Sequence, residues 1–195
     1  ASCVAYRAVT EKGIPIKLKQ FCPENLEPGS VAYVQAEERF YAAYRQQLSM
    51  LGDPMLTNIT SGLLSLYRDS SDRPWSAVSD SRGKTLDRVL TALPLNAAFR
   101  ILKQLAESIR AYHDAGWLLL DIKPENILVI DSAGITGVNF FDFDSFLRVQ
   151  DLQDAIHDRK KLMISSSPVF SAPELQRAPV DLNTVSYACD LYSLG

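Results

Sequence analysis

Apolar and polar side chains alternate near the beginning of the chain. In residues 14–22 the alternation has a period of two, which predicts a strand with one buried face. Residues 3–9 predict a second strand, and a turn that contains Gly13 joins the two. Residues 62–67 and 75–80 predict two more strands, separated by a polar turn. The first part of the chain is therefore predicted to form a small antiparallel sheet.

Elsewhere the apolar residues recur every three or four positions, which predicts helices. Residues 34–51 form one such segment, ended by Gly52-Asp53-Pro54. A second helix is predicted from about 97 to 115, with Asn96 as its N-cap and Gly116 just past its end. Its expected buried stripe consists of Ala98, Leu102, Leu105, Ile109 and Tyr112.

The remainder of the chain gives weaker signals. Residues 137–141 predict a short strand, and the segment from Asp142 to about Ser171 is long and polar. Residues 183–195 predict the beginning of another helix. The second part of the chain is therefore predicted to be mainly helical, and the whole chain to be of the α+β class.

Composition excludes several classes of protein. The chain has 195 residues, 47% of them hydrophobic and 22% charged, with a net charge of -3. This balance is ordinary for a globular protein, and its mild acidity argues against a nucleic-acid partner. No apolar run approaches the roughly 20 residues of a membrane helix. Three scattered cysteines favour reduced thiols and a cytoplasmic location. The oligomeric state stays open.

One polar turn between two apolar runs carries most of the candidate chemistry. It places Asp121, Lys123 and Asn126 within six residues. An Asp can accept the proton of an attacking hydroxyl, a Lys can neutralise a transferred phosphate, and an Asn offers a neutral oxygen ligand for Mg²⁺. A further carboxylate, Asp142, follows the predicted strand 137–141. These residue types together predict phosphoryl transfer, which needs positioned charges more than covalent chemistry.

The same residues resemble motifs of the protein kinase superfamily. Asp121-Ile122-Lys123-Pro124-Glu125-Asn126 resembles the catalytic loop H-R-D-x-x-x-x-N, in the form found in Ser/Thr kinases. Asp142-Phe143-Asp144 stands where the metal-binding D-F-G triplet belongs, and Ala172-Pro173-Glu174 matches A-P-E. Residues 190–195 resemble the D-x-W-S-L-G start of a central helix. Four motifs in the family's order make the resemblance specific.

The resemblance implies a two-lobed protein kinase-like α+β fold. Residues 1–78 would form the small ATP-binding lobe, residues 79–84 the hinge and residues 85–195 the helical catalytic lobe, with ATP between the lobes. We expect both lobes to be incomplete. The glycine-rich loop that covers the phosphates and the last helices of the large lobe are not recognisable in the chain.

The resemblance also implies an activity and a set of site residues. The expected reaction transfers the γ-phosphate of ATP to a Ser or Thr hydroxyl of a protein substrate. Asp121 would orient and deprotonate the acceptor, and Lys123 would neutralise the transferred phosphate. Asn126 and Asp142 would hold Mg²⁺.

Further residues are expected to bind the nucleotide. Lys19 is the candidate for the lysine that holds the α- and β-phosphates, because Lys19-Gln20-Phe21-Cys22-Pro23 resembles the K-E-F-Y-P run of some bacterial kinases. Lys17 is the alternative, since Ile14-Pro15-Ile16-Lys17 resembles V-A-I-K and both lysines point the same way from a strand. Val78 falls at the gatekeeper position, and the adenine-contacting positions are Ser79, Asp80 and Ser81.

The chain departs from the family pattern around the catalytic Asp. Leu119 and Leu120 replace the His and Arg of the loop. That Arg usually reads a phosphate on the activation segment, so we expect activity not to depend on phosphorylation of Ser165, Ser166 or Ser167.

Two more departures support a second interpretation. Asp144 replaces the Gly of D-F-G, and the helical Glu that should pair with the strand lysine is unclear. Counting places Ala43 or Tyr44 at that position, with Glu37 and Glu38 as alternatives. The alternative function is therefore a pseudokinase, a nucleotide-binding regulatory or interaction module.

The remaining polar residues are expected to be structural. By resemblance, Asp190 holds the backbone of the catalytic loop and Glu174 anchors the segment before it. His113 is expected to be a packed residue at a helix end, with no part in the loop. The charged cluster 158–161 is expected to be a solvated loop, with contact to a substrate or partner as the alternative.

Overall fold

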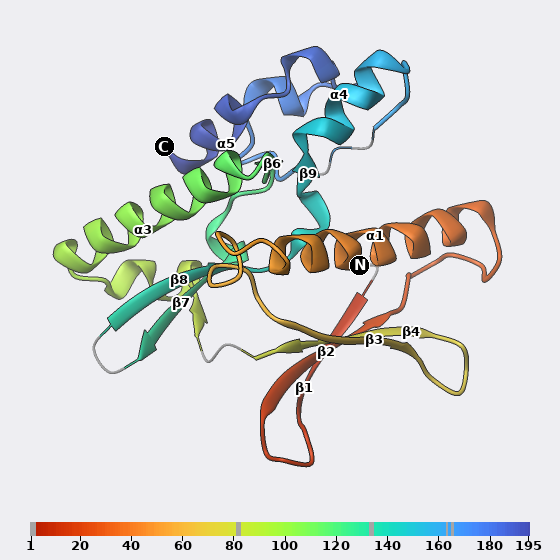
Figure 1. Cartoon of the computed structure of the whole chain (residues 1–195), viewed down its shortest axis with the longest axis horizontal. Helices are drawn as coiled ribbons and strands as arrows, with labels where there is room; N and C mark the ends of the chain where they lie inside the picture. The colour runs from red at the N-terminus through yellow and green to blue at the C-terminus, as the bar shows by residue number, and fades with distance from the viewer. Residues whose placement is uncertain (1–2, 81–82, 133–134, 163, 165) are drawn as a thin grey trace. The chain divides into compact units, whose positions relative to one another are not determined.

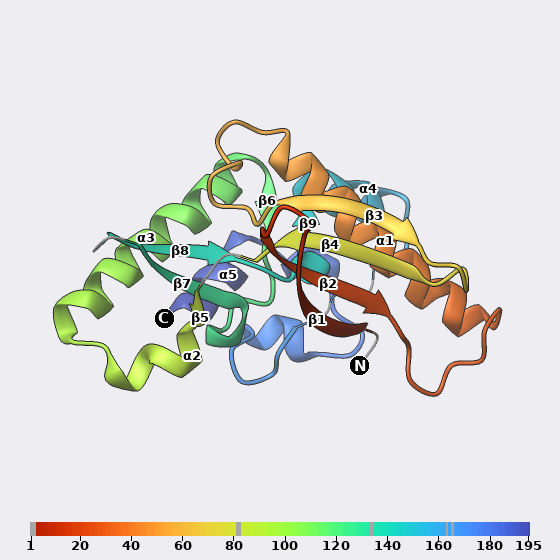
Figure 2. The same cartoon turned by 90° about the horizontal axis from the view of Figure 1, so that it is seen from below.

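The computed structural model describes residues 3–80, 83–132, 135–162, 164 and 166–195. It divides into two compact units, Ala1–Arg82 and Gly83–Gly195. Figures 1 and 2 show the first unit as a sheet with one long helix and the second as helices with short strands. The described helices and antiparallel strands confirm the α+β class, and this mixture of elements is consistent with a kinase-like fold.

The sheet of the first unit is antiparallel with the strand order β1-β2-β4-β3. Its strands are β1 (Cys3–Val9), β2 (Pro15–Phe21), β3 (Leu63–Arg68) and β4 (Pro74–Ser79). The turn between β1 and β2 uses Gly13 at φ 75°, a value that glycine adopts without strain. The four strands predicted from the alternation are confirmed, each to within one residue of its expected ends.

Helix α1 (Val31–Leu51) covers one face of this sheet, as Figure 1 shows. It begins three residues earlier than predicted, because the Ser30 side chain caps it by accepting a hydrogen bond from the Tyr33 amide at 3.2 Å. Its buried side includes Phe40 and Tyr44, which pack on Phe21 of β2. Burial of these aromatic rings fixes the helix to the sheet.

The second unit combines helices with short antiparallel pairs. A ladder joins β5 (Lys84–Thr85), β7 (Ile127–Ser132) and β8 (Ile135–Phe140), and β6 (Trp117–Leu118) pairs with β9 (Leu147–Arg148). The helices are α2 (Leu86–Val89), α3 (Leu95–Asp114), α4 (Val149–His157) and α5 (Tyr187–Leu194). Single 3₁₀ turns cover Leu90–Ala92, Pro124–Asn126, Phe143–Ser145, Pro173–Gln176 and Leu182–Thr184. None of the described helices is long and apolar enough to cross a membrane.

The predicted details of α3 were partly wrong. The helix begins at Leu95, so Asn96 lies in its first turn and does not cap it. Its buried residues are Ala97, Ile101, Leu105, Ser108, Ile109 and Tyr112. Leu102, predicted to be buried, is 48% exposed. Two apolar stripes lie side by side on this helix, and only the neighbouring elements decide which of them is covered.

The polar segment after Asp142 contains structure that its composition hides. It includes α4, whose Leu152 and Ala155 are buried. Leu152 belongs to a core cluster with Leu118 and Leu120, which lie just before the predicted catalytic Asp. A helix of two to three turns among polar residues repeats its apolar positions too few times to be recognised in the sequence.

Candidate active site

The turn after β6 brings together the three residues predicted to carry the chemistry. Asp121 Oδ2 accepts hydrogen bonds from Lys123 Nζ at 2.6 Å and from Asn126 Nδ2 at 3.0 Å. Asn126 Nδ2 also lies 3.2 Å from the backbone oxygen of Asp121. The 3₁₀ turn Pro124–Asn126 shortens the path between the residues, so that Asn126 reaches back to the Asp.

The two oxygens of Asp121 differ in their surroundings. Oδ2 takes both side-chain hydrogen bonds, whereas Oδ1 is buried and has no hydrogen-bond partner among the described residues. A buried carboxylate oxygen without a donor is unfavourable in a resting protein. Such an oxygen is suited to receive a hydroxyl group that comes from outside the chain.

Ser167 is a member of this cluster that the sequence interpretation did not assign. Lys123 Nζ donates to its Oγ at 2.7 Å, so the Lys links Asp121 to the segment before Ala172-Pro173-Glu174. The backbone oxygen of Ser167 accepts from the Ser171 amide at 2.9 Å, which fixes the serine in a turn. Its place, five residues before the A-P-E motif, was the available signal.

Asn126 and Asp142 lie at the same end of the β7–β8 ladder. Ile127 pairs with Phe140, and one step further the Phe141 amide donates to the Asn126 oxygen at 3.2 Å. Asp142 follows directly, in the left-handed region at φ 71°. A non-glycine residue in this region is strained, and such strain often occurs at functional positions.

The chemistry of this pair fits Mg²⁺. Because Asn126 Nδ2 is engaged with Asp121, its amide oxygen is the atom that could bind a cation, and Asp142 offers a carboxylate at the same end of the ladder. Among the described residues, no group of three or more His, Cys, Asp or Glu could hold a metal ion. Two protein oxygens suit Mg²⁺, which usually takes its other ligands from water and substrate phosphates.

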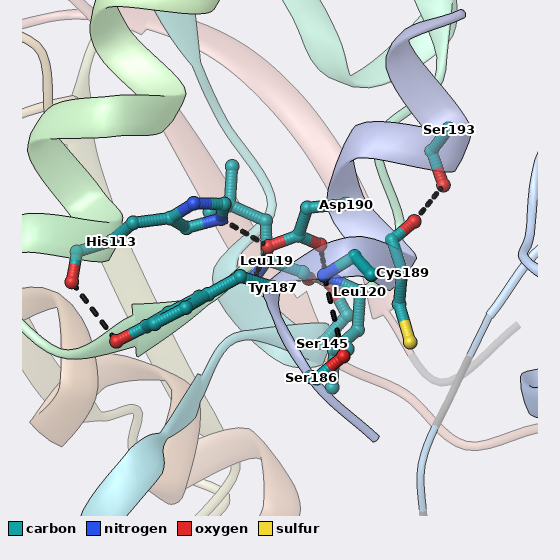
Figure 3. Close-up of polar contacts among 10 residues, drawn as sticks. His113, Leu119, Leu120, Ser145, Ser186, Tyr187, Cys189, Asp190 and Ser193 are labelled. Atoms are coloured by element: carbon teal, nitrogen blue, oxygen red, sulfur yellow. Dashed lines mark hydrogen bonds and ion pairs between the residues drawn. The ribbon is translucent and has the colours of Figure 1, made fainter. Parts of the chain in front are cut away.

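A buried carboxylate on α5 accepts hydrogen bonds from the backbone of the loop. Asp190 is 0% exposed; its Oδ2 accepts from the Leu119 amide at 2.9 Å and its Oδ1 from the Leu120 amide at 2.7 Å, as Figure 3 shows. Ser145 Oγ adds a hydrogen bond to the Leu119 oxygen at 2.8 Å. The expected role of Asp190 in holding the loop backbone is confirmed.

His113 has a role that the sequence interpretation denied it. Its Nε2 lies 2.8 Å from Asp190 Oδ2, so the histidine contacts the residue that holds the loop. The sequence predicted a packed helix-end residue because the loop chemistry does not require His113, and the residue does lie packed in the last turn of α3. The tertiary contact comes from 77 positions away in the sequence, which no local pattern reveals.

The first unit contains the two candidate lysines on one side of β2. Lys17 lies opposite Val78 of β4, and its ammonium is 3.4 Å from Asp80 Oδ1. Lys19 lies opposite Ser76, whose hydroxyl hydrogen-bonds the Tyr44 hydroxyl of α1. Side chains at alternate positions share a face, so both lysines lie on the side of the sheet that α1 covers.

The expected gatekeeper and adenine-contacting residues lie at the end of β4 and just after it. Val78 packs against the core cluster between α1 and the sheet. Ser79 Oγ accepts from the Gly62 amide at 3.1 Å, and the Asp80 amide donates to the Pro15 oxygen at 3.2 Å. Ser81 lies outside the described residues.

The acidic candidates on α1 have other surroundings than expected. Glu37 pairs with Arg68 of β3, with 2.8 Å between Oε1 and Nη2. Glu38 is exposed. Tyr44, at the position that counting gives for the helical acid, is buried and bonded to Ser76. The position counted for the helical Glu that pairs with the strand lysine is therefore not occupied by an acidic residue.

A groove of about 860 Å³ lies beside the Ser167 turn. Its apolar lining consists of Leu162, Ile164, Pro168, Leu175, Ala178, Pro179, Val180 and Leu182, with Ser166 and Gln176 as neutral polar members. Lys160, Lys161 and Arg177 add positive charge. The hydrogen bond that Lys160 Nζ donates to Asp158 Oδ2 raises the pKa of the Lys160 ammonium. No acidic residue lines the groove among the described residues.

Comparison with known proteins supports the same family. The chain is 30% identical over 161 residues to the Ser/Thr-protein kinase pkn2 of Myxococcus xanthus, an alignment of 81% of this chain and 18% of the kinase. It is 29% identical over 133 residues to a probable Ser/Thr-protein kinase PknB of Corynebacterium glutamicum, covering 65% of this chain and 20% of the kinase. Smooth muscle myosin light chain kinase of Gallus gallus is 25% identical over 118 residues, 59% of this chain and 6% of the kinase. No family model matches the chain.

These similarities confirm the resemblance to the protein kinase superfamily. The relatives are Ser/Thr kinases, two of them bacterial, and the chain has a protein kinase-like α+β fold. It spans about a fifth of the length of the two bacterial kinases that it matches.

Proposed function

We propose that the protein transfers the γ-phosphate of ATP to a Ser or Thr hydroxyl of a protein substrate. The observation that carries the proposal is the buried Oδ1 of Asp121, which has no hydrogen-bond partner in the described part of the chain, while Oδ2 is held by Lys123 and Asn126. The carboxylate is fixed by one oxygen and offers the other. A general base needs this combination of a fixed position and a lone pair that is not already engaged in a hydrogen bond.

The proposed reaction uses the residues of the loop in defined roles. The acceptor oxygen forms a bond to the γ-phosphorus, the bond from that phosphorus to the bridging oxygen of ADP breaks, and the hydroxyl proton goes to Asp121 Oδ1. Lys123, 2.6 Å from Asp121 Oδ2, supplies positive charge beside the transferred group. Mg²⁺, when bound, neutralises phosphate charge, and Asn126 Oδ1 and the Asp142 carboxylate are the proposed ligands.

The nucleotide-binding residues complete the proposal. We propose Lys19 for the α- and β-phosphates, on the resemblance of Lys19-Gln20-Phe21-Cys22-Pro23 to the K-E-F-Y-P run of some bacterial kinases, with Lys17 as the alternative. Val78 is proposed as the gatekeeper of the nucleotide site, and Ser79, Asp80 and Ser81 are proposed to contact the adenine. A cytoplasmic location remains our expectation for a protein that uses ATP.

The groove beside Ser167 is proposed to receive the substrate segment around the acceptor. Its apolar lining suits an apolar side chain, and Lys161 and Arg177 suit carboxylates. Peptides with Asp or Glu within a few residues of the acceptor should therefore be phosphorylated about tenfold more efficiently than matched neutral peptides, since one well-placed charged contact contributes roughly 1.4 kcal/mol. Equal phosphorylation efficiency for acidic and neutral peptides would show that the groove does not bind the substrate segment as proposed.

Transfer of labelled phosphate by the full-length protein tests the function. Asp121→Asn should lower the rate by about 10²–10⁴-fold, the usual contribution of a general base. Asp142→Ala should abolish the Mg²⁺-dependent transfer. Asp151→Asn, which removes an exposed carboxylate on α4, is the matched control and should leave the rate unchanged. Equal transfer by the wild type and Asp142→Ala would disprove the metal assignment.

A regulatory module that binds nucleotide without turnover is the second candidate. Tyr44 favours it, because it occupies the counted position of the helical acid and hydrogen-bonds Ser76. The expected results for this candidate are ATP binding, no labelled product, and the same ATP affinity in the wild type and Asp121→Asn.

A further inference from the structure

His113 lies in the last turn of α3, where its ring meets the central residue of α5. Nε2 is 2.8 Å from Asp190 Oδ2, and the two side chains are 13% and 0% exposed. Figure 3 shows the imidazole and the Leu119–Leu120 backbone arranged around the same carboxylate. The contact is thus shielded from water and lies directly beneath the loop that carries Asp121.

The hydrogen bonds define which atom of the pair donates. Asp190 Oδ2 accepts from the Leu119 amide at 2.9 Å, and Oδ1 accepts from the Leu120 amide at 2.7 Å. In this arrangement Nε2 of His113 carries a hydrogen, because two acceptor atoms would repel each other at 2.8 Å. Among the residues that the structure describes, Asp190 therefore receives three donors, two from backbone amides and one from the His113 side chain.

The backbone that Asp190 holds is strained. Leu120 has φ 64°, a left-handed value that is unfavourable for a leucine. The Asp121 amide donates to the Leu119 oxygen at 2.9 Å, so the chain turns tightly just before the catalytic residue. Without a fixed acceptor beneath it, this turn would relax toward an extended backbone and move the Asp121 side chain.

His113 is itself held from two sides by α5. The Tyr187 hydroxyl donates to the His113 oxygen at 3.0 Å, and the two rings lie 4.3 Å apart between centroids. Tyr187 and Asp190 are three residues apart on one helix and so present the same face. Leu119 and Leu120 donate to Asp190 through their backbone amides alone, because their side chains are apolar, whereas His113 contacts it through its ring.

We propose that His113 is a positioning residue for phosphate transfer. Its hydrogen bond to Asp190 fixes the orientation of the carboxylate, which fixes the Leu119–Leu120 turn and the place of Asp121. The inference rests on the proposed function for its kinetic consequence, and on the hydrogen bonds alone for its effect on the turn.

Two variants of His113 in the full-length protein separate the hydrogen bond from packing. His113→Phe keeps a ring and removes the donor, whereas His113→Gln places an amide nitrogen near the position of Nε2. His113→Phe should lower kcat about tenfold and leave the KM for ATP and for peptide within twofold. His113→Gln should recover most of kcat. His157, exposed on α4, provides the control pair His157→Phe and His157→Gln, both with wild-type kinetics.

Hydrogen exchange of the Leu119 and Leu120 amides gives a readout that does not need activity. His113→Phe should accelerate exchange of both amides about tenfold or more, and His113→Gln should restore their protection. If the wild type transfers no phosphate, the proposed function fails while this exchange result still decides the inference. Unchanged protection in His113→Phe, or equal losses of kcat and protection in both variants, would overturn it.

Discussion

The Asp121 loop and helix α1 hold their polar groups in different ways. Asp190, beneath the loop, is fully buried and binds backbone amides at 2.7 and 2.9 Å. Glu37 on α1 pairs with Arg68 at 2.8 Å, with 20% and 40% of the two side chains exposed. A buried carboxylate that satisfies several donors has no easy substitute, whereas a surface pair can be exchanged at little cost. We therefore expect the Asp190 contacts to contribute more to stability than the Glu37–Arg68 pair.

Removing the buried carboxylate should have the largest effect of this comparison. Asp190→Asn keeps the shape but replaces one acceptor oxygen by a donor, so an amide of Leu119 or Leu120 loses its partner. The expected loss is about 3–5 kcal/mol of unfolding free energy, typical of a broken buried charge network. Urea unfolding followed by Trp117 fluorescence, in a Trp75→Phe background, measures it in the second unit.

Labelling of Cys189 gives an independent check on the same variant. Cys189 is 0% exposed, and burial raises the pKa of its thiol, so the wild type should react slowly with iodoacetamide. Asp190→Asn should speed this labelling, while exposed Cys22 reacts equally in both proteins. A variant with wild-type stability and labelling would mean that the turn does not need Asp190.

The Tyr44–Ser76 contact should give an intermediate effect. Tyr44→Phe leaves the hydroxyl of Ser76, which is 0% exposed, without this partner. The expected cost is about 1–3 kcal/mol for an unsatisfied buried polar group. Trp75 fluorescence in a Trp117→Phe background reports it for the first unit, and Tyr67→Phe, at an exposed tyrosine of β3, is the control. Equal stability of both variants would show that the contact is energetically neutral.

The surface pair should matter least. Glu37→Gln removes the charge that faces Arg68 and should cost no more than about 1 kcal/mol, less at high salt, because exposed ion pairs are weak and screened. The same fluorescence measurement at low and high salt tests it. A loss of stability as large as that of Asp190→Asn would contradict the proposed difference between the two regions.

Local patterns predicted the elements that are set by local constraints. The alternation in 14–22 marks β2, and the polar turn between two apolar runs marks the loop with Asp121, Lys123 and Asn126. The stripe of α3 and the existence of α4 were not predicted correctly. On α3 two neighbouring stripes of apolar residues could each have been the buried one. In α4 the helix is too short for its apolar repeat to be recognised.

The sequence by itself determined the family resemblance, the α+β class and the order of the motifs, because residue type and spacing along the chain carry that information. The tertiary structure alone decided which residues from distant parts of the sequence contact the motif residues. Ser167 reaches Lys123 from 44 positions away and His113 reaches Asp190 from 77, and no described residue hydrogen-bonds Asp121 Oδ1. Contacts of this kind depend on how elements pack, and packing is a property of the folded chain rather than of any one segment.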